Sequence, residues 1–177
     1  MKNSAIFSDK DHNKLTYYEC FESPLGVLCI GASDVGLRSI TKITNEYPTA
    51  KPNEFTAETK IQLQKYFDRG LTKFEIPLDL SGYTEFSIRV WNQLLTIPYG
   101  KTISYMKLSV LLGDVKAIRA VGTANGRNPI PIIIPCHRVI GSDGSLTGFA
   151  LGLEFKRSLL KLENPDKYSA HQGVLAL

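Results

Sequence analysis

The sequence is short of several features that mark common protein classes. Its three cysteines, Cys20, Cys29 and Cys136, are an odd number without close pairing, which argues against a disulfide framework and for a reducing compartment. No apolar run approaches the roughly 18 residues that a membrane span needs, and the N-terminus carries no apolar signal region. No cluster of metal-ligating residues is present either. We therefore expect an intracellular protein, cytoplasmic or in a eukaryote nuclear, that binds neither a membrane nor a metal.

Acidic residues are scarce in only one part of the chain. Residues 89–138 hold seven basic residues and one acidic residue. Residues 1–88 hold ten basic and twelve acidic residues, and residues 139–177 hold four basic and four acidic residues. The formal net charge of +4 therefore comes from the middle segment. A surface that contacts phosphate groups needs such a local excess of lysine and arginine. A solvated basic face without a ligand would have the same composition.

Residues 80–82, Leu-Ser-Gly, separate two halves of different character. We assign residues 1–82 to an N-terminal α/β supporting domain and residues 83–177 to a C-terminal domain. The fold class that we expect is α+β. A small N-terminal antiparallel sheet with a helix is followed by a mostly helical, winged-helix-like domain that contains a helix-turn-helix.

The pattern of apolar and turn-forming residues predicts the individual elements. Short apolar runs broken by proline and glycine predict antiparallel strands between residues 15 and 44. Residues 56–67 are predicted to form a helix and residues 74–78 a further strand. Apolar residues at the helical period predict another helix over residues 84–95, with Thr84 as its N-cap.

Two short helices with a tight turn between them are predicted after residue 103. They cover residues 104–112 and 115–124, and Gly113 and Asp114 form the turn, which is helix-turn-helix spacing. Polar residues recur on one face of the second helix at steps of three and four, namely Lys116, Arg119 and Thr123. The small residue Ala120 would let this backbone approach a ligand closely. A helical hairpin packed inside the domain would show the same pattern.

Cys136 lies between an apolar run and the pair His137 and Arg138. A thiol reacts as its thiolate, and neighbouring imidazole and cationic groups lower its pKa from about 8.5. The pattern therefore predicts a reactive sulfur, although free cysteines are often merely buried. Adjacent side chains of a strand point to opposite faces, so His137 needs a bridging water or a local turn to act on this sulfur. The imidazole also needs an orienting carboxylate, for which the downstream candidates are Glu163, Glu154 and Asp143.

Six stretches between residues 86 and 163 follow the pattern of a known family. They are FSIRVW at 86–91, IPYGKTISY at 97–105, RAVG at 119–122, NPIP at 128–131, PCHRVIG at 135–141 and GSLTGF at 144–149. With these motifs the chain resembles the methylated-DNA–protein-cysteine methyltransferase family, which repairs O6-alkylguanine. Residues 15–80 are similar to the family only loosely.

The resemblance implies DNA repair by a methylated-DNA–[protein]-cysteine S-methyltransferase. The alkyl group of O6-alkylguanine, with O4-alkylthymine as a second candidate substrate, moves irreversibly to Cys136 after the base has been flipped out of the duplex. Each molecule acts once, because the thioether that forms has no second nucleophile to remove it. The resemblance also implies double-stranded DNA bound through its minor groove, no cofactor and a monomeric protein.

The resemblance assigns roles to individual residues. Cys136, His137 and Glu163 match the family's charge relay, in which a water links the imidazole to the sulfur. Tyr105 matches the tyrosine that assists flipping and hydrogen-bonds to the base, and Asn128 matches the asparagine that braces the cysteine loop. Arg138 is expected to be structural. The implied DNA-binding residues are Arg119, which fills the gap left by the flipped base, with Lys116, Ala120, Thr123 and Tyr105. The implied substrate pocket consists of Val139, Phe149, Ala150 and Leu151.

The chain departs from the family pattern at a few positions. Cys20, Cys29 and His12 do not form the four-ligand set through which some members bind structural zinc, so we predict no zinc. Phe149 replaces a tyrosine of some members and should preserve the apolar pocket wall. Leu151 stands where glycine is frequent, and its larger side chain is expected to narrow the pocket mouth against groups such as benzyl.

Two other functional classes stay open on sequence grounds. A thiol hydrolase with Cys136, His137 and Glu163 as its triad would turn over an ester or amide repeatedly and would not need the basic helix. A non-catalytic helix-turn-helix regulator would not need Cys136 and would recognise a base sequence. The stoichiometry of the reaction identifies the first class, and a Cys136→Ala protein that keeps its biological role would identify the second.

Overall fold

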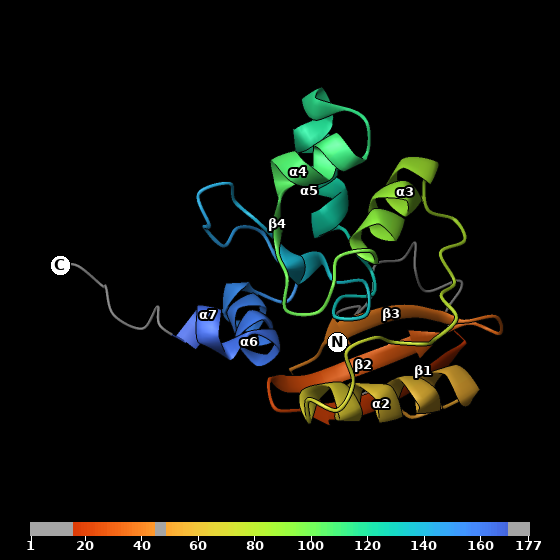
Figure 1. Cartoon of the computed structure of the whole chain (residues 1–177). Helices are drawn as coiled ribbons and strands as arrows, with labels where there is room; N and C mark the ends of the chain where they lie inside the picture. Colours follow the sequence, from red (N-terminus) through yellow and green to blue (C-terminus); the bar gives the residue numbers. More distant parts are fainter. Residues whose placement is uncertain (1–15, 45–48, 170–177) are drawn as a thin grey trace, which may run out of the picture. The chain divides into compact units, whose positions relative to one another are not determined.

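The computed structural model describes residues 16–44 and 49–169. The chain divides into two compact units, Met1–Ser81 and Gly82–Leu177, whose elements are labelled in Figure 1. The first unit combines a three-stranded antiparallel sheet with a helix, and the second is mostly helical. The predicted α+β class is therefore confirmed. No helix within the described ranges is long and apolar enough to cross a membrane.

The sheet of the first unit has the order β1-β2-β3, with β1 at Tyr17–Ser23, β2 at Gly26–Ala32 and β3 at Leu37–Lys42. A two-residue turn joins β1 to β2 in a register that pairs Ser23 with Gly26. Gly26 has φ +113°, a conformation that side chains other than glycine rarely adopt. The proline and glycine that broke the apolar pattern thus mark a hairpin, as predicted.

Helix α2, at Glu54–Phe67, contacts all three strands. It begins two residues earlier than predicted, because Asn53 and Thr56 form a capping box: the Asn53 side chain accepts from the Thr56 backbone N–H, and the Thr56 hydroxyl accepts from the Asn53 N–H. On the covered side α2 buries Leu63 and Tyr66 completely. Burial of these large apolar groups stabilises the helix far more than its own propensity does.

The predicted strand over residues 74–78 is absent, and this prediction was wrong. Only Leu78 pairs, in an isolated parallel bridge to Leu37. The Leu37 N–H donates to the Pro77 carbonyl at 2.9 Å, and the Asp79 N–H donates to the Leu37 carbonyl at 2.9 Å. Pro77 has no N–H of its own, so it cannot extend the ladder.

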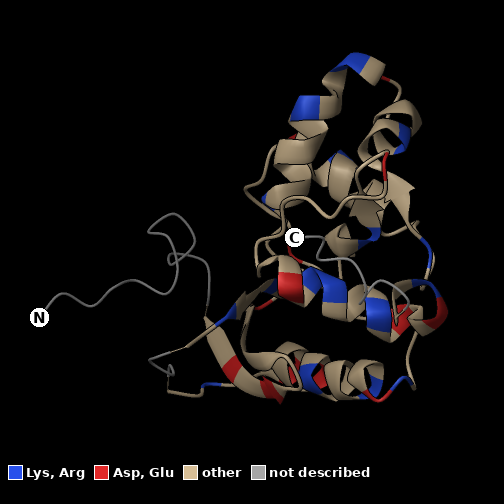
Figure 2. Ribbon diagram, turned by 90° about the vertical axis from the view of Figure 1, so that its left-hand side faces the viewer, with Lys and Arg blue, Asp and Glu red and all other residues tan. Residues whose placement is uncertain are grey.

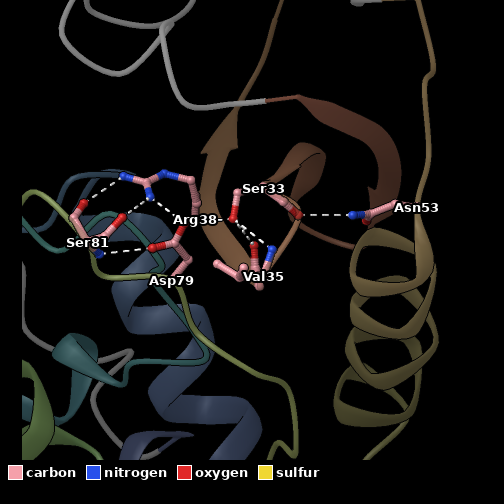
Figure 3. A network of polar contacts seen from close by, with 7 residues as sticks. Ser33, Val35, Arg38, Asn53, Asp79 and Ser81 are labelled. Carbon is pink, nitrogen blue, oxygen red and sulfur yellow. Dashed lines mark hydrogen bonds and ion pairs between the residues drawn. The ribbon is translucent and has the colours of Figure 1, made fainter.

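A buried polar network ties the end of the first unit to β3 (Figure 3). The Arg38 guanidinium donates to Asp79 at 2.5 Å and to the hydroxyl and carbonyl oxygens of Ser81, each at 3.0 Å. The Ser33 hydroxyl donates to the same Asp79 oxygen at 2.6 Å, and the Asn53 side chain donates to the Ser33 carbonyl at 3.1 Å. Burial raises the pKa of Asp79, but its hydrogen bonds outweigh burial and hold this pKa well below its usual range.

The elements of the second unit are short and follow each other closely. In chain order they are α3 (Glu85–Leu94), β4 (Ile103–Ser104), α4 (Tyr105–Leu111), η1 (Val115–Ala117), α5 (Ile118–Gly126), η2 (Cys136–Arg138), β5 (Val139–Ile140), α6 (Leu153–Glu163) and α7 (Pro165–Ser169). The strands β4 and β5 form a parallel pair. This pair joins the start of α4 to the residues that follow Cys136.

The predicted helix after Thr84 is α3. The Thr84 hydroxyl accepts from the Ser87 N–H at 3.3 Å, as expected of an N-cap. One face of α3 buries Val90 and Trp91. The Trp91 indole donates to the Ala124 carbonyl at 2.9 Å and thereby fixes the last turn of α5.

The predicted helix-turn-helix corresponds to α4, η1 and α5. The second helix differs from the prediction, because residues 115–117 form a 3-10 turn and α5 then continues to Gly126. Asp114 opens this turn by accepting from the Lys116 N–H at 2.8 Å. Val121 and Ala124 are buried against the rest of the unit, so the opposite face of α5 is left to solvent.

Candidate active site

The apolar run before Cys136 is a buried loop held by one side chain. The Asn128 amide nitrogen donates to the Ile134 carbonyl at 2.7 Å, and its oxygen accepts from the Ile130 N–H at 3.0 Å. Ile132 has φ +78° although it is β-branched, so this loop is locally strained. The same Asn128 nitrogen lies 3.0 Å from the Cys136 sulfur, so one amide both closes the loop and contacts the thiol.

Cys136 begins the 3-10 turn η2, so the structure has a local turn here, one of the two alternatives that the sequence left open. Its backbone N–H donates to the Ile134 carbonyl at 2.8 Å, and the side chain is 2% exposed. Burial raises the pKa of the Cys136 thiol to about 11, because the bond from Asn128 and the charge of Lys156 offset burial only in part. The predicted lowering of this pKa is therefore wrong for the unbound protein. Arg138, expected to contribute to it, is engaged elsewhere.

His137 is completely buried and contacts Glu163, with 2.8 Å between Nε2 and Oε1. Burial lowers the pKa of His137, although Glu163 raises it, so the ring is neutral at pH 7. The Glu163 carboxylate can only accept, so Nε2 must be the protonated nitrogen. Nδ1 is then the basic nitrogen, and it has no hydrogen-bond partner among the described residues. This nitrogen can take a proton.

Glu163 is the carboxylate that the structure selects from the three candidates. Asp143 accepts from Ser145, and Glu154 pairs with Arg157, both on the exposed surface. Neither contact involves His137.

Arg138 holds Glu163 in place through two parallel hydrogen bonds. Its Nε donates to Oε2 and its Nη2 donates to Oε1, each at 2.9 Å, while Nη1 donates to the Ile97 carbonyl at 2.6 Å. The Gly100 N–H also donates to Oε2 at 3.1 Å. Burial raises the pKa of Glu163, but the bonds from His137 and Arg138 outweigh burial and hold it well below its usual range. This geometry supports the structural role predicted for Arg138.

Tyr105 begins α4 and directs its hydroxyl to the Thr147 carbonyl, which accepts at 3.3 Å. Its ring lies against α5 at Gly122, where an added Cβ would meet a ring carbon at 3.9 Å. Burial raises the pKa of Tyr105, and hydrogen bonds with Thr147 and Asn125 lower it. The negative charge of a Cys136 thiolate would raise the pKa of Tyr105 further.

Lys156 is a site residue that sequence reasoning missed. It is completely buried on α6, and its Nζ donates to the carbonyls of Val139 at 2.7 Å and Thr147 at 2.9 Å. Burial lowers the pKa of Lys156 to about 8. A lysine is rarely buried, so its type gave no warning. One signal was available: Lys156 and Glu163 are two helical turns apart and share a face of α6.

The predicted pocket residues differ in their surroundings. Val139 is buried, Leu151 is half-buried and Ala150 is exposed. The Phe149 ring lies edge-on to the His137 ring, with 6.4 Å between centroids. Phe149 therefore forms an apolar wall beside the imidazole, whereas the effect of Leu151 on bulky groups stays a prediction.

Four of the five predicted DNA-binding residues lie on η1 and α5, and all four are exposed: Lys116, Arg119, Ala120 and Thr123. The fifth, Tyr105, begins α4 and is half-buried. Figure 2 colours the basic residues of α4, η1 and α5 blue. Asn128, which contacts the buried thiol, is the second residue after the end of α5, so the exposed cationic face and the thiol site belong to adjoining segments of the chain.

No three His, Cys, Asp or Glu side chains group as a metal site in the described part of the chain. Cys20 and Cys29 are register partners on β1 and β2, and His12 lies outside the described residues. The absence of zinc stays a prediction.

Comparison with known proteins gives a consistent result. Residues 85–165 match a family model described as 6-O-methylguanine DNA methyltransferase, DNA binding domain. A protein of Methanosarcina acetivorans named methylated-DNA–protein-cysteine methyltransferase is 45% identical to this chain, over 83% of this chain and 97% of that protein. A protein of the same name from Mycobacterium tuberculosis is 44% identical, over 84% of this chain and 93% of that protein.

Solved structures agree with these relatives. The crystal structure of M. tuberculosis O6-methylguanine methyltransferase has a TM-score of 0.75 at 42% identity and covers 84% of this chain and 93% of its own. A structure of the M. tuberculosis protein OGT in complex with DNA has a TM-score of 0.77 at 43% identity and covers 85% and 94%. The identity and coverage of these relatives, together with the buried cysteine site, show that the chain belongs to the methylated-DNA–protein-cysteine methyltransferase family.

Proposed function

We propose that this protein repairs DNA by moving the alkyl group from O6 of guanine to the sulfur of Cys136. Family membership supports the reaction class, and the DNA complex of the M. tuberculosis relative supports DNA as the partner. One observation carries the assignment to Cys136: its sulfur accepts from Asn128, and the next residue in the chain is a neutral His137 whose Nδ1 has no partner among the described residues and can take a proton. A cysteine with a merely structural role needs neither neighbour.

The proton path follows from the pKa directions. The thiol rests in its neutral form, since burial raises the pKa of Cys136. Its proton passes to His137 Nδ1, directly or through a bridging water, as the sulfur attacks the alkyl carbon. Glu163 then stabilises the imidazolium, as the carboxylate of a catalytic triad does. Arg138 keeps this carboxylate ionised and fixed in position.

The displacement balances without a cofactor. A carbon–sulfur bond forms, the carbon–O6 bond breaks, and its electron pair stays with the guanine. Tyr105 donates a hydrogen bond to the departing base, and the proton taken from the thiol replaces the lost alkyl group. The thioether on Cys136 has no nucleophile to remove it, so each molecule acts once.

Access to O6 requires the base to leave the duplex, because a side chain cannot reach this atom inside the stack. The exposed face of α5 supports binding in the minor groove, with Arg119 entering the gap that the base leaves. Lys116 adds a phosphate contact, while Ala120 and Thr123 allow close approach. We further infer that the protein acts as a monomer in a reducing compartment, where Cys136 stays a free thiol.

A direct test uses a duplex with a single O6-methylguanine. The protein should gain one methyl group on the peptide that contains Cys136, saturating at one per molecule, and the duplex should regain guanine. Cys136→Ser should gain none, whereas Cys29→Ser should behave as the unaltered protein. An unchanged mass with the lesion intact would refute the proposal. Strong inactivation by O6-benzylguanine would refute only the narrow pocket mouth at Leu151.

A further inference from the structure

The turn at residues 98–101 lies against the end of α6. The Lys101 N–H donates to the Pro98 carbonyl at 3.1 Å, and Gly100, the third residue of the turn, has φ +70°, which favours glycine at this position. A Cβ added to Gly100 would lie 2.9 Å from the Glu163 carbonyl oxygen, so the two backbones are in close contact. Any shift of this turn would therefore reach the residue that orients His137.

Both polar backbone groups of Gly100 bond to the end of α6. Its N–H donates to Glu163 Oε2 at 3.1 Å, and its carbonyl accepts from the Asn164 amide nitrogen at 3.1 Å. The Asn164 amide oxygen accepts from the Lys167 N–H at 3.1 Å, as a residue that caps α7 would. One side-chain amide thus joins the turn to α7. The proposed mechanism uses neither Asn164 nor α7.

The Glu163 carboxylate accepts from two donors at each oxygen. His137 and Arg138 Nη2 bond to Oε1, whereas Arg138 Nε and the Gly100 N–H bond to Oε2. Two bonds at each oxygen fill the acceptor capacity of a carboxylate. The Gly100 donor belongs to the backbone of a turn that is itself held at both ends, while a guanidinium lies at the end of a long, rotatable side chain. We therefore expect Gly100 to fix the position of Oε2 and, with it, the direction in which Oε1 faces His137.

We propose that Asn164 is a positioning residue for methyl transfer, whose amide nitrogen holds the Gly100 carbonyl so that the Gly100 N–H keeps Glu163 directed at His137. This inference rests on the proposed function. A carboxylate that shifts out of line leaves the imidazole poorly oriented to accept the thiol proton. Helix α7 supports this arrangement a second time, because the Thr102 hydroxyl accepts from Lys167 Nζ at 3.2 Å.

The first test removes the amide donor in two ways. Asn164→Ala loses both contacts of the amide, whereas Asn164→Ser can still cap α7. At saturating O6-methylguanine duplex, the single-turnover rate should fall about tenfold in both variants, the value of one modest hydrogen bond. The Kd for the duplex should stay unchanged, because the proposed DNA-binding face lies on η1 and α5. Asn92→Ala, which alters an exposed residue of α3, should keep the full rate. A full rate in Asn164→Ser would mean that Asn164 only caps α7, and would overturn the proposal.

A spectroscopic signature tests the same contact without DNA. The Nε2 proton of His137 is buried and bonded to Glu163, so it should give a downfield proton NMR resonance that exchanges slowly with solvent. Its absence in His137→Gln assigns it. In both Asn164 variants this resonance should move upfield and exchange faster, because the bond to Glu163 is weaker. An unchanged resonance would overturn the positioning role even if the rate fell.

Gly100→Ala disturbs the turn from its other side. Alanine is strained at this φ, and its Cβ would press on the Glu163 carbonyl, so transfer should slow and the His137 resonance should move as in the Asn164 variants. Gly26→Ala is the matched control, since it is strained at φ +113° in the β1–β2 hairpin and should change neither. Urea titration of Trp91 fluorescence establishes that each variant is folded, and Asn164→Ser decides the test if Gly100→Ala is not. Failure of the unaltered protein to gain a methyl group would overturn the proposed function itself.

Discussion

Each unit of this protein contains a buried arginine–carboxylate pair, and the two pairs serve different ends. In the first unit Arg38 and Asp79 are surrounded by serine and asparagine partners, and both Asp79 oxygens accept hydrogen bonds. In the second unit Arg138 and Glu163 are joined by His137, whose Nδ1 has no partner among the described residues. Every buried polar side-chain atom of the first network has a partner, whereas the second network leaves Nδ1 of His137, the residue after Cys136, without one in the described part of the chain.

This difference separates a network that stabilises a fold from one that performs chemistry. A buried polar atom without a hydrogen-bond partner destabilises the native state, so a purely structural network is most stable when each of its polar atoms has a partner. A catalytic network must keep a group free to exchange a proton with the substrate. Of the two arginine–carboxylate networks, only the second has such an atom, Nδ1 of His137. Elsewhere among the described residues, the buried atoms Glu19 Oε2, Ser39 Oγ and Asn125 Oδ1 also have no partner.

Removal of the His137 imidazole should have the largest effect on the rate of methyl transfer. His137→Gln takes away the group that accepts the thiol proton, and general-base contributions are about 100-fold to 10,000-fold. The single-turnover rate of methyl transfer at pH 7 should fall by at least about 100-fold. Ser33→Ala, which alters only the first network, should leave this rate unchanged. If His137→Gln transferred methyl as fast as the unaltered protein, the second network would have no catalytic role and the two networks would not differ in function.

Neutralising either carboxylate should destabilise its own unit. Asp79→Asn and Glu163→Gln each leave a buried arginine without its counter-ion, which costs about 3–5 kcal/mol. Trp91 is the single tryptophan and lies in the second unit, so its fluorescence in urea reports Glu163→Gln, while circular dichroism records both variants. Only Glu163→Gln should also slow methyl transfer. A comparable loss of transfer in Asp79→Asn would mean that the first network is not purely structural.

Exchange of each arginine for lysine should have a smaller effect. Lysine keeps the charge but cannot form the two parallel bonds of a guanidinium, so Arg138→Lys and Arg38→Lys should each lose about 1.5–3 kcal/mol of unfolding free energy. Arg138→Lys should also slow transfer, because a looser Glu163 orients His137 poorly. Equal transfer rates in the two lysine variants would indicate that the orientation of Glu163 is unimportant.

Mild acid should produce the smallest of these effects, a loss of unfolding free energy in the second unit but not in the first. Burial lowers the folded-state pKa of His137, so the unfolded chain binds more protons below about pH 6.5 and the second unit loses stability as pH falls through this value. The loss between pH 7 and pH 5.5 should be at most about 1 kcal/mol, the limit for an imidazole that stays neutral in the folded state. The folded pKa of Asp79 is also lowered, but its unfolded pKa is about 3.9, so its contribution is lost only in stronger acid. Urea titrations of Trp91 fluorescence at both pH values measure the difference, and His137→Gln should abolish it.

Much of the fold could be predicted because its signals are local. The hairpin at residues 23–26, the cap at Thr84 and the tight turn before η1 depend on residues within a few positions of each other. The errors arose where the outcome depended on distant partners. Residues 74–78 look like a strand, yet β3 offers them only one bridge. The boundary of α2 moved because Asn53 and Thr56 satisfy each other's backbone.

The candidate site also has some features that the sequence predicted and others that depend on residues distant in the chain. The Cys-His-Arg sequence predicted that His137 needs an orienting carboxylate but left three candidates open, and only the family resemblance pointed to Glu163, which the structure places against His137. The burial of Lys156, the unpaired oxygen of Asn125 and the raised pKa of Cys136 had no sequence signal that sufficed. Each of these depends on how much water and how many partners the folded chain leaves around a side chain.

The sequence by itself determined the α+β class, the order of most elements and the family, because periodicity, caps and motifs are written in neighbouring residues. Tertiary structure alone decided which of three carboxylates meets His137 and that Arg138 serves this carboxylate rather than the thiol. It also decided that Cys136 rests as a neutral thiol. The physical reason is that pKa values and hydrogen-bond partners are set by desolvation and by contacts between residues far apart in the chain.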